Sequence, residues 1–483
     1  MKLRLIILSF FIIFACSDED DERFIPSATE ELAAQDFIWK SMNIWYLWKD
    51  TSENVRDDSF TNNNSYRAFL SSFSTPEELF YEGILVNEDR FSNITNDYNS
   101  LFNSQQGIST SNGIEYSLYR IGDGNDVVGV VRYIIPGSDA SNKNINRGDI
   151  FYAVNGTSLY SNRLNTSDNN FDIIRQDNIT LEFADVIDDT IIPNNIEIEF
   201  VRSELTENPV HKVNVIEQGG SKIGYLMYNR FTATFDDELN DVFANLKSQG
   251  ITELVLDLRY NPGGSVTSST RLASMITGQF NGTLYSRLRY NDFWQDYFGN
   301  DRLTYNFTNQ INNGVPINSL NLTRVYILTS SRTASASELL INGLSPHIDV
   351  IQIGDITVGK NQASITLLDD PRGNYVNTVP YSGKSREQAS KLHTYAIQPI
   401  VSTTENSIGF SEYEDGLLPD IEIKESVSNF GILGDINEPL LAKAIEEITG
   451  VASKFASKKS NIKSEFISDS KMILPTKNSM YID

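Results

Sequence analysis

The feature of this sequence that most constrains its fold is an alternation of apolar runs and amphipathic segments between residues 206 and 426. Residues 223–226 and 254–258 have the composition of buried strands. Between them, apolar side chains recur at helical spacing on one face: Phe235, Leu239, Val242, Phe243 and Leu246. Because strands connected through helices run parallel in one sheet, this pattern predicts a βα core with a parallel sheet, placed at residues 206–450.

Two further domains are expected before this core, because a chain of 483 residues is too long for one hydrophobic core. Residues 30–48 carry apolar and aromatic side chains at helical spacing, which predicts a small helical domain over residues 30–106. Residues 107–205 contain short alternating runs separated by Gly, Pro and Asn, which predicts a β-rich domain. The expected fold class is therefore α/β and multi-domain. The segment Asn-Glu-Asp-Arg-Phe-Ser at residues 87–92 has no evident chemical role.

Within the β-rich region, the order of turns and strands is distinctive. Residues 135–140 (Ile-Pro-Gly-Ser-Asp-Ala) and 146–156 (Asn-Arg-Gly-Asp-Ile-Phe-Tyr-Ala-Val-Asn-Gly) read as turn, short helix, turn, strand and tight turn. This order resembles a PDZ domain. The resemblance implies that Gly113 and Ile114 lie in the loop whose backbone N–H groups bind the carboxylate of a peptide C-terminus.

The first residues have the pattern of a targeting segment: a short basic start, an apolar run and then Cys16. This predicts a signal peptide at residues 1–15, too short to remain as a membrane-spanning helix. Residues 13–16 (Ile-Phe-Ala-Cys) resemble a bacterial lipobox, which implies acylation of Cys16 and a lipid anchor in the membrane; simple cleavage is the alternative. The acidic residues at 16–29 resemble the export signal of surface lipoproteins of Bacteroidetes, and they read equally well as a solvated tether. We therefore expect an outer-membrane lipoprotein of a bacterial cell envelope, facing either the periplasm or the surface.

Composition excludes several classes of function. The net charge is −25, from 39 Lys and Arg against 64 Asp and Glu, so nucleic acid is not an expected partner. With Cys16 as its single cysteine, the chain can form no internal disulfide and has no spare thiol nucleophile. No cysteine pair, H-E-x-x-H motif or phosphate loop is present, so no metal and no cofactor is expected. Residues 451–483, rich in Lys and Ser, predict a flexible tail.

A candidate nucleophile lies in the segment that follows the apolar run at residues 325–329. The small residues Thr333-Ala334-Ser335-Ala336 read as a turn into a helix, where the first helical N–H groups can face developing negative charge. Ser335 is then either a nucleophile or an ordinary N-cap, with Glu338 completing a capping box. The local sequence alone favours the cap.

A nucleophilic serine needs a base, and the chain has three histidines, none in a recognisable hydrolase motif. A Ser-His-Asp arrangement stays open, because such triads are assembled in space rather than along the sequence. Lys360 is the other candidate: it follows an apolar run and a probable buried strand, where desolvation would keep the lysine neutral. A solvated surface lysine is the alternative.

The strand at 254–258 runs into Arg-Tyr-Asn-Pro-Gly-Gly at residues 259–264. This turn either merely ends the strand or presents a backbone N–H to an oxyanion, together with the N–H of Ala336.

These elements together resemble the C-terminal processing, or tail-specific, serine peptidases. The family pattern is a strand ending in D-L-R-x-N-x-G-G, a turn S/T-A-S-A-S-E, and a G-K twenty-five residues after the nucleophile; here 360 − 335 gives 25. The resemblance implies a crotonase-like core with Ser335 as nucleophile, Lys360 as general base, and Gly263 with Ala336 as oxyanion donors. It also implies polypeptide substrates, recognised through their C-termini by the PDZ-like domain.

One departure from the family pattern concerns the residue that orients the lysine. Many members have a glutamine four residues after the lysine; here that position is Ser364, and Gln362 lies two residues earlier. Both are taken as auxiliary candidates. The departure leaves a second hypothesis open, in which a weak or inactive peptidase fold binds peptides or scaffolds an envelope complex.

Overall fold

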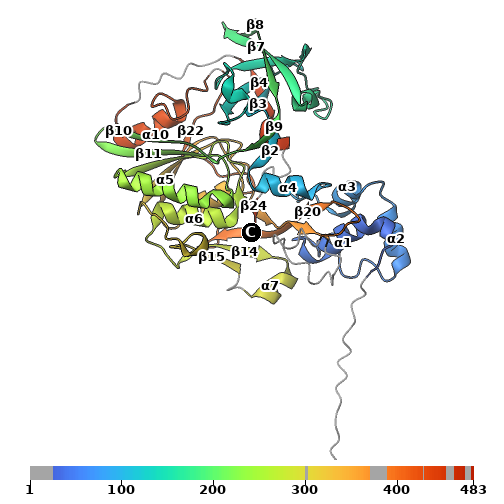
Figure 1. The fold of residues 1–483 in the computed structure, drawn as a ribbon. Coiled ribbons are helices and arrows are strands. Elements are labelled where there is room, and N and C mark those ends of the chain that lie inside the picture. Colours follow the sequence, from blue (N-terminus) through green and yellow to red (C-terminus); the bar gives the residue numbers. More distant parts are fainter. Residues whose placement is uncertain are drawn as a thin grey trace, which may run out of the picture.

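The structure is a computed structural model that describes residues 26–299, 303–369, 389–427, 429–452, 462–473 and 480–482. The predicted signal peptide and Cys16 lie outside the described residues. The described chain forms a helical part, a β-rich part and a mixed α/β core, which confirms the predicted fold class (Figure 1). No helix within the described ranges has the length and apolarity needed to cross a bilayer.

The helical part surrounds a core of aromatic side chains. Trp39, Trp45, Tyr66 and Phe80 are all buried in it. Three helices begin at side-chain caps, because Asn62 accepts hydrogen bonds from the first turn of α2, Thr75 from that of α3 and Asp97 from that of α4. The elements are η1 (Glu30–Leu32), α1 (Ala33–Trp45), α2 (Asn63–Ser71), α3 (Pro76–Glu78), η2 (Leu79–Ile84), β1 (Asn93–Thr95) and α4 (Tyr98–Gln105).

The β-rich part is an antiparallel sheet with the order β23-β3-β4-β5-β7-β8, with β6 paired to β5. Alternate side chains of its strands fill a separate apolar core. Its elements are β3 (Ile114–Ile121), β4 (Val127–Ile134), η3 (Ala140–Asn142), β5 (Ile150–Val154), β6 (Thr157–Ser158), η4 (Phe171–Arg175), β7 (Asn178–Ile187) and β8 (Thr190–Val201). The strands β2 (Ile108–Ser111) and β9 (Ser203–Thr206) pair beside it and lead into the core.

The core contains a six-stranded sheet in the order β10-β11-β12-β16-β17-β22. All neighbours from β11 onward are parallel, as the sequence predicts, while β10 is an antiparallel edge strand. The strands are β10 (Val210–Gln218), β11 (Ser221–Tyr228), β12 (Glu253–Asp257), β16 (Arg324–Thr329), β17 (Asp349–Gly354) and β22 (Ile421–Glu422).

Helices cover both faces of this sheet, which explains why its strands are apolar on both sides. One face packs on α5 (Asp236–Ser248), α6 (Val266–Thr277) and α8 (Ala336–Leu344), and the other on α10 (Pro439–Thr449). Figure 1 shows α5 and α6 side by side below β11, with α10 on the opposite side. The short η5 (Ala233–Phe235) leads into α5.

Two further sheets join the core to the helical part. One has the order β13-β24-β18-β21-β14-β15 and the other β1-β20-β19. Their elements are β13 (Gly264–Ser265), β14 (Leu284–Tyr290), α7 (Asp292–Phe298), β15 (Thr304–Asn306), η7 (Asn312–Gly314), β18 (Gln362–Ser364), β19 (Leu367–Leu368), β20 (Ala396–Gln398), β21 (Ile400–Asn406) and β24 (Met480–Tyr481).

The prediction of a flexible tail over residues 451–483 is wrong for two described stretches. Strand β23 (Ser464–Asp469), followed by η9 (Ser470–Ile473), joins the β-rich sheet, and β24 joins the core. The polar composition is misleading here, because Asp469, Ser470 and Lys471 are buried in hydrogen bonds and ion pairs instead of being solvated.

Candidate active site

Ser335 lies at the sharp turn between β16 and α8. Its backbone has φ +66° and ψ −115°, a conformation that costs a non-glycine residue on the order of 1–3 kcal/mol. The turn is held against the loop that follows β12. Thr333 Oγ1 donates to the carbonyl of Leu258 (2.9 Å), and the Ala334 N–H donates to that of Asn261 (3.1 Å). Strain fixed in this way is typical of functional residues.

The side chain of Ser335 is not used as a helix cap. Its Oγ is fully buried and has no hydrogen-bond partner among the residues that the structure describes. The other half of the expected capping box is present, since the Ser335 N–H donates to Glu338 (2.5 Å). No histidine is therefore hydrogen-bonded to the serine in this conformation, and its hydroxyl is left for chemistry.

The carboxylate of Glu338 joins the two predicted catalytic segments. One oxygen, Oε2, accepts from the backbone N–H groups of Ser335 and Lys360, the latter at 2.9 Å. The other, Oε1, accepts from Thr357 Oγ1 (2.5 Å) and the Gly359 N–H (2.6 Å). Burial raises the pKa of Glu338, while these donors oppose the shift. Glu338 thus fixes the serine turn and the lysine loop relative to each other.

Lys360 is buried, with 1% of its surface exposed, at the end of the loop after β17. Burial lowers the pKa of Lys360 from 10.5 to about 7, although the negative charges of Asp89 and Glu338 oppose this shift. A large share of the side chain is therefore neutral near pH 7 and able to accept a proton. Its Nζ lies 5.0 Å from the centre of the Phe91 ring.

Residues 87–92 of the helical part lie against this lysine, a role that the sequence did not reveal. Asp89 Oδ1 accepts from the N–H groups of Phe91 (3.0 Å) and Ser92 (2.8 Å), which shapes the loop. Arg90 donates to the carbonyls of Glu414 (2.9 Å) and Val358 (3.3 Å), and so ties the loop to the lysine segment. The helical part therefore contributes both an aromatic wall and a negative charge to the site.

Gly263 lies directly against the serine turn. A Cβ on Gly263 would be 2.6 Å from the Cβ of Ser335 and 2.9 Å from the nitrogen of Ala336, and the glycine has φ +105°. Ala336 begins α8, so its N–H is one of the first, outward-facing donors of the helix. The Gly263 N–H donates to Asn261 Oδ1 (2.9 Å) in this conformation, so an oxyanion there would compete with that side chain.

Two family models match the chain. The model described as Peptidase S41 N-terminal domain matches residues 33–93, and the model described as Peptidase family S41 matches residues 222–402. The chain belongs to peptidase family S41.

Individual relatives agree with this assignment. A carboxyl-terminal-processing protease of Picosynechococcus sp. is 24% identical over 376 residues, covering 75% of this chain and 83% of the relative. The chloroplastic carboxyl-terminal-processing peptidase 3 of Arabidopsis thaliana is 24% identical over 323 residues, covering 61% of this chain and 57% of the relative. A putative S41 protease from Bacteroides fragilis has the same fold, with a TM-score of 0.65, 24% identity, and coverage of 89% of this chain and 99% of that one. The prediction of a serine-type peptidase related to the C-terminal processing enzymes is confirmed.

The two auxiliary candidates of this S41 peptidase differ in their surroundings. Ser364 Oγ donates to the carbonyl of Met480 (3.0 Å), so it holds strand β24. Gln362 lies on β18, and its buried Oε1 has no partner within the described part of the chain. Of the two, Gln362 has the acceptor that could orient a neighbouring group.

The predicted carboxylate-binding loop of the PDZ-like domain is closed on itself. The N–H of Gly113 donates to Ser111 Oγ (3.0 Å), and the N–H of Ile114 donates to Asn112 Oδ1 (3.1 Å). Both loop residues are buried. The two residues lie at the start of β3, and their N–H donors are engaged locally.

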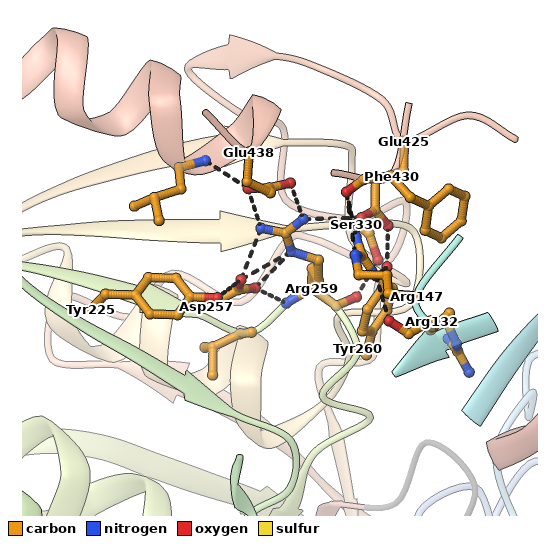
Figure 2. A network of polar contacts seen from close by, with 12 residues as sticks. Arg132, Arg147, Tyr225, Asp257, Arg259, Tyr260, Ser330, Glu425, Phe430 and Glu438 are labelled. Atoms are coloured by element: carbon orange, nitrogen blue, oxygen red, sulfur yellow. Dashed lines mark hydrogen bonds and ion pairs between the residues drawn. The ribbon is translucent and has the colours of Figure 1, made fainter. Parts of the chain in front are cut away.

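A buried charge network connects the β-rich part of the S41 peptidase to the segment before Ser335 (Figure 2). Arg259 is fully buried and pairs with Asp257 (2.8 Å) and Glu438 (2.6 Å). Glu425 accepts from Arg259 (3.0 Å) and from Arg147, which lies in the β-rich part. The carbonyl of Arg259 accepts from the hydroxyl of Ser330, five residues before Ser335. Asp257 and Arg259 of the D-L-R motif therefore hold the segment before Ser335 in position.

Proposed function

We propose that this S41 peptidase hydrolyses peptide bonds of polypeptides, with Ser335 as nucleophile and Lys360 as general base. The observation that carries the proposal is the carboxylate of Glu338, which accepts hydrogen bonds from the backbone N–H groups of both Ser335 and Lys360. The Ser335 hydroxyl has no hydrogen-bond partner among the described residues, and the Lys360 side chain is buried. The lowered pKa of Lys360, about 7, supports a base that is neutral at physiological pH.

The reaction follows from these groups. Lys360 Nζ accepts the Ser335 hydroxyl proton as Oγ attacks the substrate carbonyl carbon, and the carbonyl oxygen becomes an oxyanion facing the Ala336 and Gly263 N–H groups. The C–N bond then breaks, and the Lys360 ammonium returns the proton to the leaving amine. A water molecule, deprotonated by Lys360, next attacks the serine ester. Release of the carboxylic acid restores the Ser335 hydroxyl and the neutral lysine.

The presence of a PDZ-like domain favours substrates that bind through an extended C-terminal segment. Domains of this kind bind such segments as an added strand, and a relative is named a carboxyl-terminal-processing protease. The location proposed for the activity is the bacterial envelope, through a lipid on Cys16. Metabolic labelling with palmitate tests this location: wild-type protein should carry the label and Cys16→Ser should not, and an unlabelled wild-type protein would contradict it.

The dyad is tested by digestion of an unfolded protein such as casein. Ser335→Ala and Lys360→Ala should each lower the rate by roughly three orders of magnitude or more. Lys247→Ala is the matched control, since Lys247 is an exposed lysine at the end of α5. Unchanged cleavage by Ser335→Ala would reject the assignment.

A further inference from the structure

Strand β23 occupies the edge of the PDZ-like sheet at which a peptide ligand would pair. It runs antiparallel to β3, with Ser464 opposite Ile121 and Asp469 opposite Ser117. Strand β3 begins directly after the predicted carboxylate-binding loop and would be the edge of the sheet without β23. Peptide ligands bind PDZ domains by adding a strand to a sheet edge, and β23 does this from within the same chain.

Strand β23 is more exposed to solvent than a core strand, as expected for a bound ligand. Its residues from Ser464 to Ser468 are exposed or half-buried, whereas β3 is mostly buried. The side chain of Ile467 packs against the apolar core of the PDZ-like domain, and Glu465 is 55% exposed. Ser470 Oγ accepts from the N–H of Tyr116 (3.2 Å) on β3, which extends the contact beyond the strand. Among residues 464–468, Ile467 is the side chain that packs on this core, while Phe466 contacts Tyr119 and Arg332 and Glu465 pairs with Arg120.

Asp469, at the end of β23, reaches the catalytic turn. Its buried carboxylate pairs with Arg332 (2.5 Å), three residues before Ser335. It also pairs with Arg132 of β4 (3.4 Å), whose guanidinium lies 4.7 Å from the ring centre of Tyr260; Arg132 and Tyr260 are both labelled in Figure 2. The occupied edge of β3 and the turn that carries the nucleophile are thereby joined through one carboxylate.

The chain returns to the active site a second time at β24. Met480 and Tyr481 pair in parallel with Gly264 and Ser265, directly after the predicted oxyanion residue Gly263. Both Ser335 and Lys360 are buried in this arrangement, with 0% and 1% exposed. Strand β23 thus contacts the segment before Ser335 and β24 the segment after Gly263, around a serine and a lysine that are closed to solvent.

We propose that the segment from Ser464 to Lys471 is an intramolecular ligand of the PDZ-like domain that holds the peptidase in a closed state. An extended polypeptide substrate would displace β23 from β3, withdraw Asp469 from Arg332 and release the turn before Ser335. The inference rests on the proposed function and adds to it a means of control by the substrate itself.

A reversible disulfide tests the proposal in the full chain with Cys16→Ser, whose introduced cysteines are then the only ones. Ser464→Cys and Ile121→Cys lie opposite each other, and facing residues of antiparallel strands have Cα atoms close enough for a disulfide. The reduced protein should digest casein at the parent rate, the oxidised protein about tenfold more slowly or worse, and added thiol should restore the rate. Equal rates for the oxidised and reduced proteins would overturn the proposal.

The matched control is a second disulfide at the exposed end of the β7–β8 hairpin, from Ile187→Cys and Thr190→Cys. Its oxidation should leave the rate unchanged. The control separates locking of the β3 edge from a general effect of oxidation.

A binding measurement keeps the proposal separate from the peptidase chemistry. A labelled synthetic peptide of residues 462–473 should bind the Ser335→Ala, Ile467→Ser protein about tenfold more tightly than the Ser335→Ala protein, because its own strand is weakened. The Ile467→Ser change in the active chain should raise kcat/KM. Equal peptide binding, or a fall in activity that follows a fall in Tm, would show that β23 is only structural, whereas enhanced binding without any cleavage would refute the peptidase proposal alone.

Discussion

The backbone N–H groups of Ser335 and Lys360 donate to the same carboxylate oxygen of Glu338, at 2.5 and 2.9 Å. A single buried side chain thus sets the relation between the proposed nucleophile and the proposed base, which lie twenty-five residues apart (360 − 335). Replacing Glu338 by glutamine, which is neutral and of similar size, should disturb this relation without leaving a cavity.

Glu338→Gln should therefore lower kcat by roughly 10- to 100-fold, because an amide brings its own N–H donors towards backbone N–H groups and one of them loses its acceptor. KM should change little, since Glu338 is buried behind the reacting groups. Steady-state kinetics on a fluorogenic peptide check both values. Glu217→Gln, at an exposed position, serves as the control. A change in KM alone would mean that Glu338 acts on substrate binding instead.

The dependence of kcat/KM on pH should show one ascending limb centred at about pH 7, since the base acts when Lys360 is neutral and its pKa is lowered to about 7. Asp89 raises this pKa, so Asp89→Asn should move the limb to lower pH. Initial rates from pH 5 to 9 would measure the midpoint. An unmoved midpoint, or one displaced to higher pH, would contradict a charge of Asp89 acting on the lysine.

Lys360→Met should stabilise the fold near neutral pH. Burial lowers the lysine pKa from 10.5 to about 7, so the unfolded chain binds a proton between these pH values that the folded chain does not. The cost of burying the lysine is full below pH 7, declines as pH rises and is absent above 10.5. Urea unfolding should thus give Lys360→Met a gain of roughly 2–4 kcal/mol at pH 7 and a smaller gain at pH 10. Lys247→Met should show no gain at either pH.

Gly263→Ala should strongly lower activity through a steric clash with the serine turn. The added methyl group would meet Ser335 Cβ at 2.6 Å and the Ala336 nitrogen at 2.9 Å, so the turn must move where the oxyanion forms. We expect a loss of roughly 100-fold or more in kcat. Gly282→Ala is a matched control, because Gly282 also has positive φ (+81°) but has nothing within 4 Å of its Cβ position. If both variants lose activity equally, backbone strain and not the contact with Ser335 is responsible.

The sequence predicted the parts of the fold and site that depend on local pattern. The strands around β12 and β16 are apolar on both faces, and Ser335 and Lys360 lie in motifs with a fixed spacing, so both could be found without coordinates. Glu338 was read as half of a helix cap, because a capping pattern reveals only one of the four groups that it binds.

The missed features depend on contacts between distant segments. Asp89 and Phe91 approach Lys360 from about 270 residues away, in a segment with no periodicity. Asp469 was placed in a flexible tail, since its buried arginine partners come from β4 and the serine turn and leave no trace in local composition. Ser364 was considered for the lysine because of its position, but it bonds to β24, a strand that the polar tail did not predict.

The pairing of β23 with β3 also has a consequence for how the chain acquires its fold. Strands separated by more than 340 residues must meet to complete one sheet, and such high contact order slows folding because a very long loop has to close first. During synthesis, residues 114–121 emerge long before residues 464–469. Until the later segment arrives, the newly made chain carries an unpaired strand edge that other extended polypeptides can join. The chain is therefore most prone to aggregation before its fold is complete.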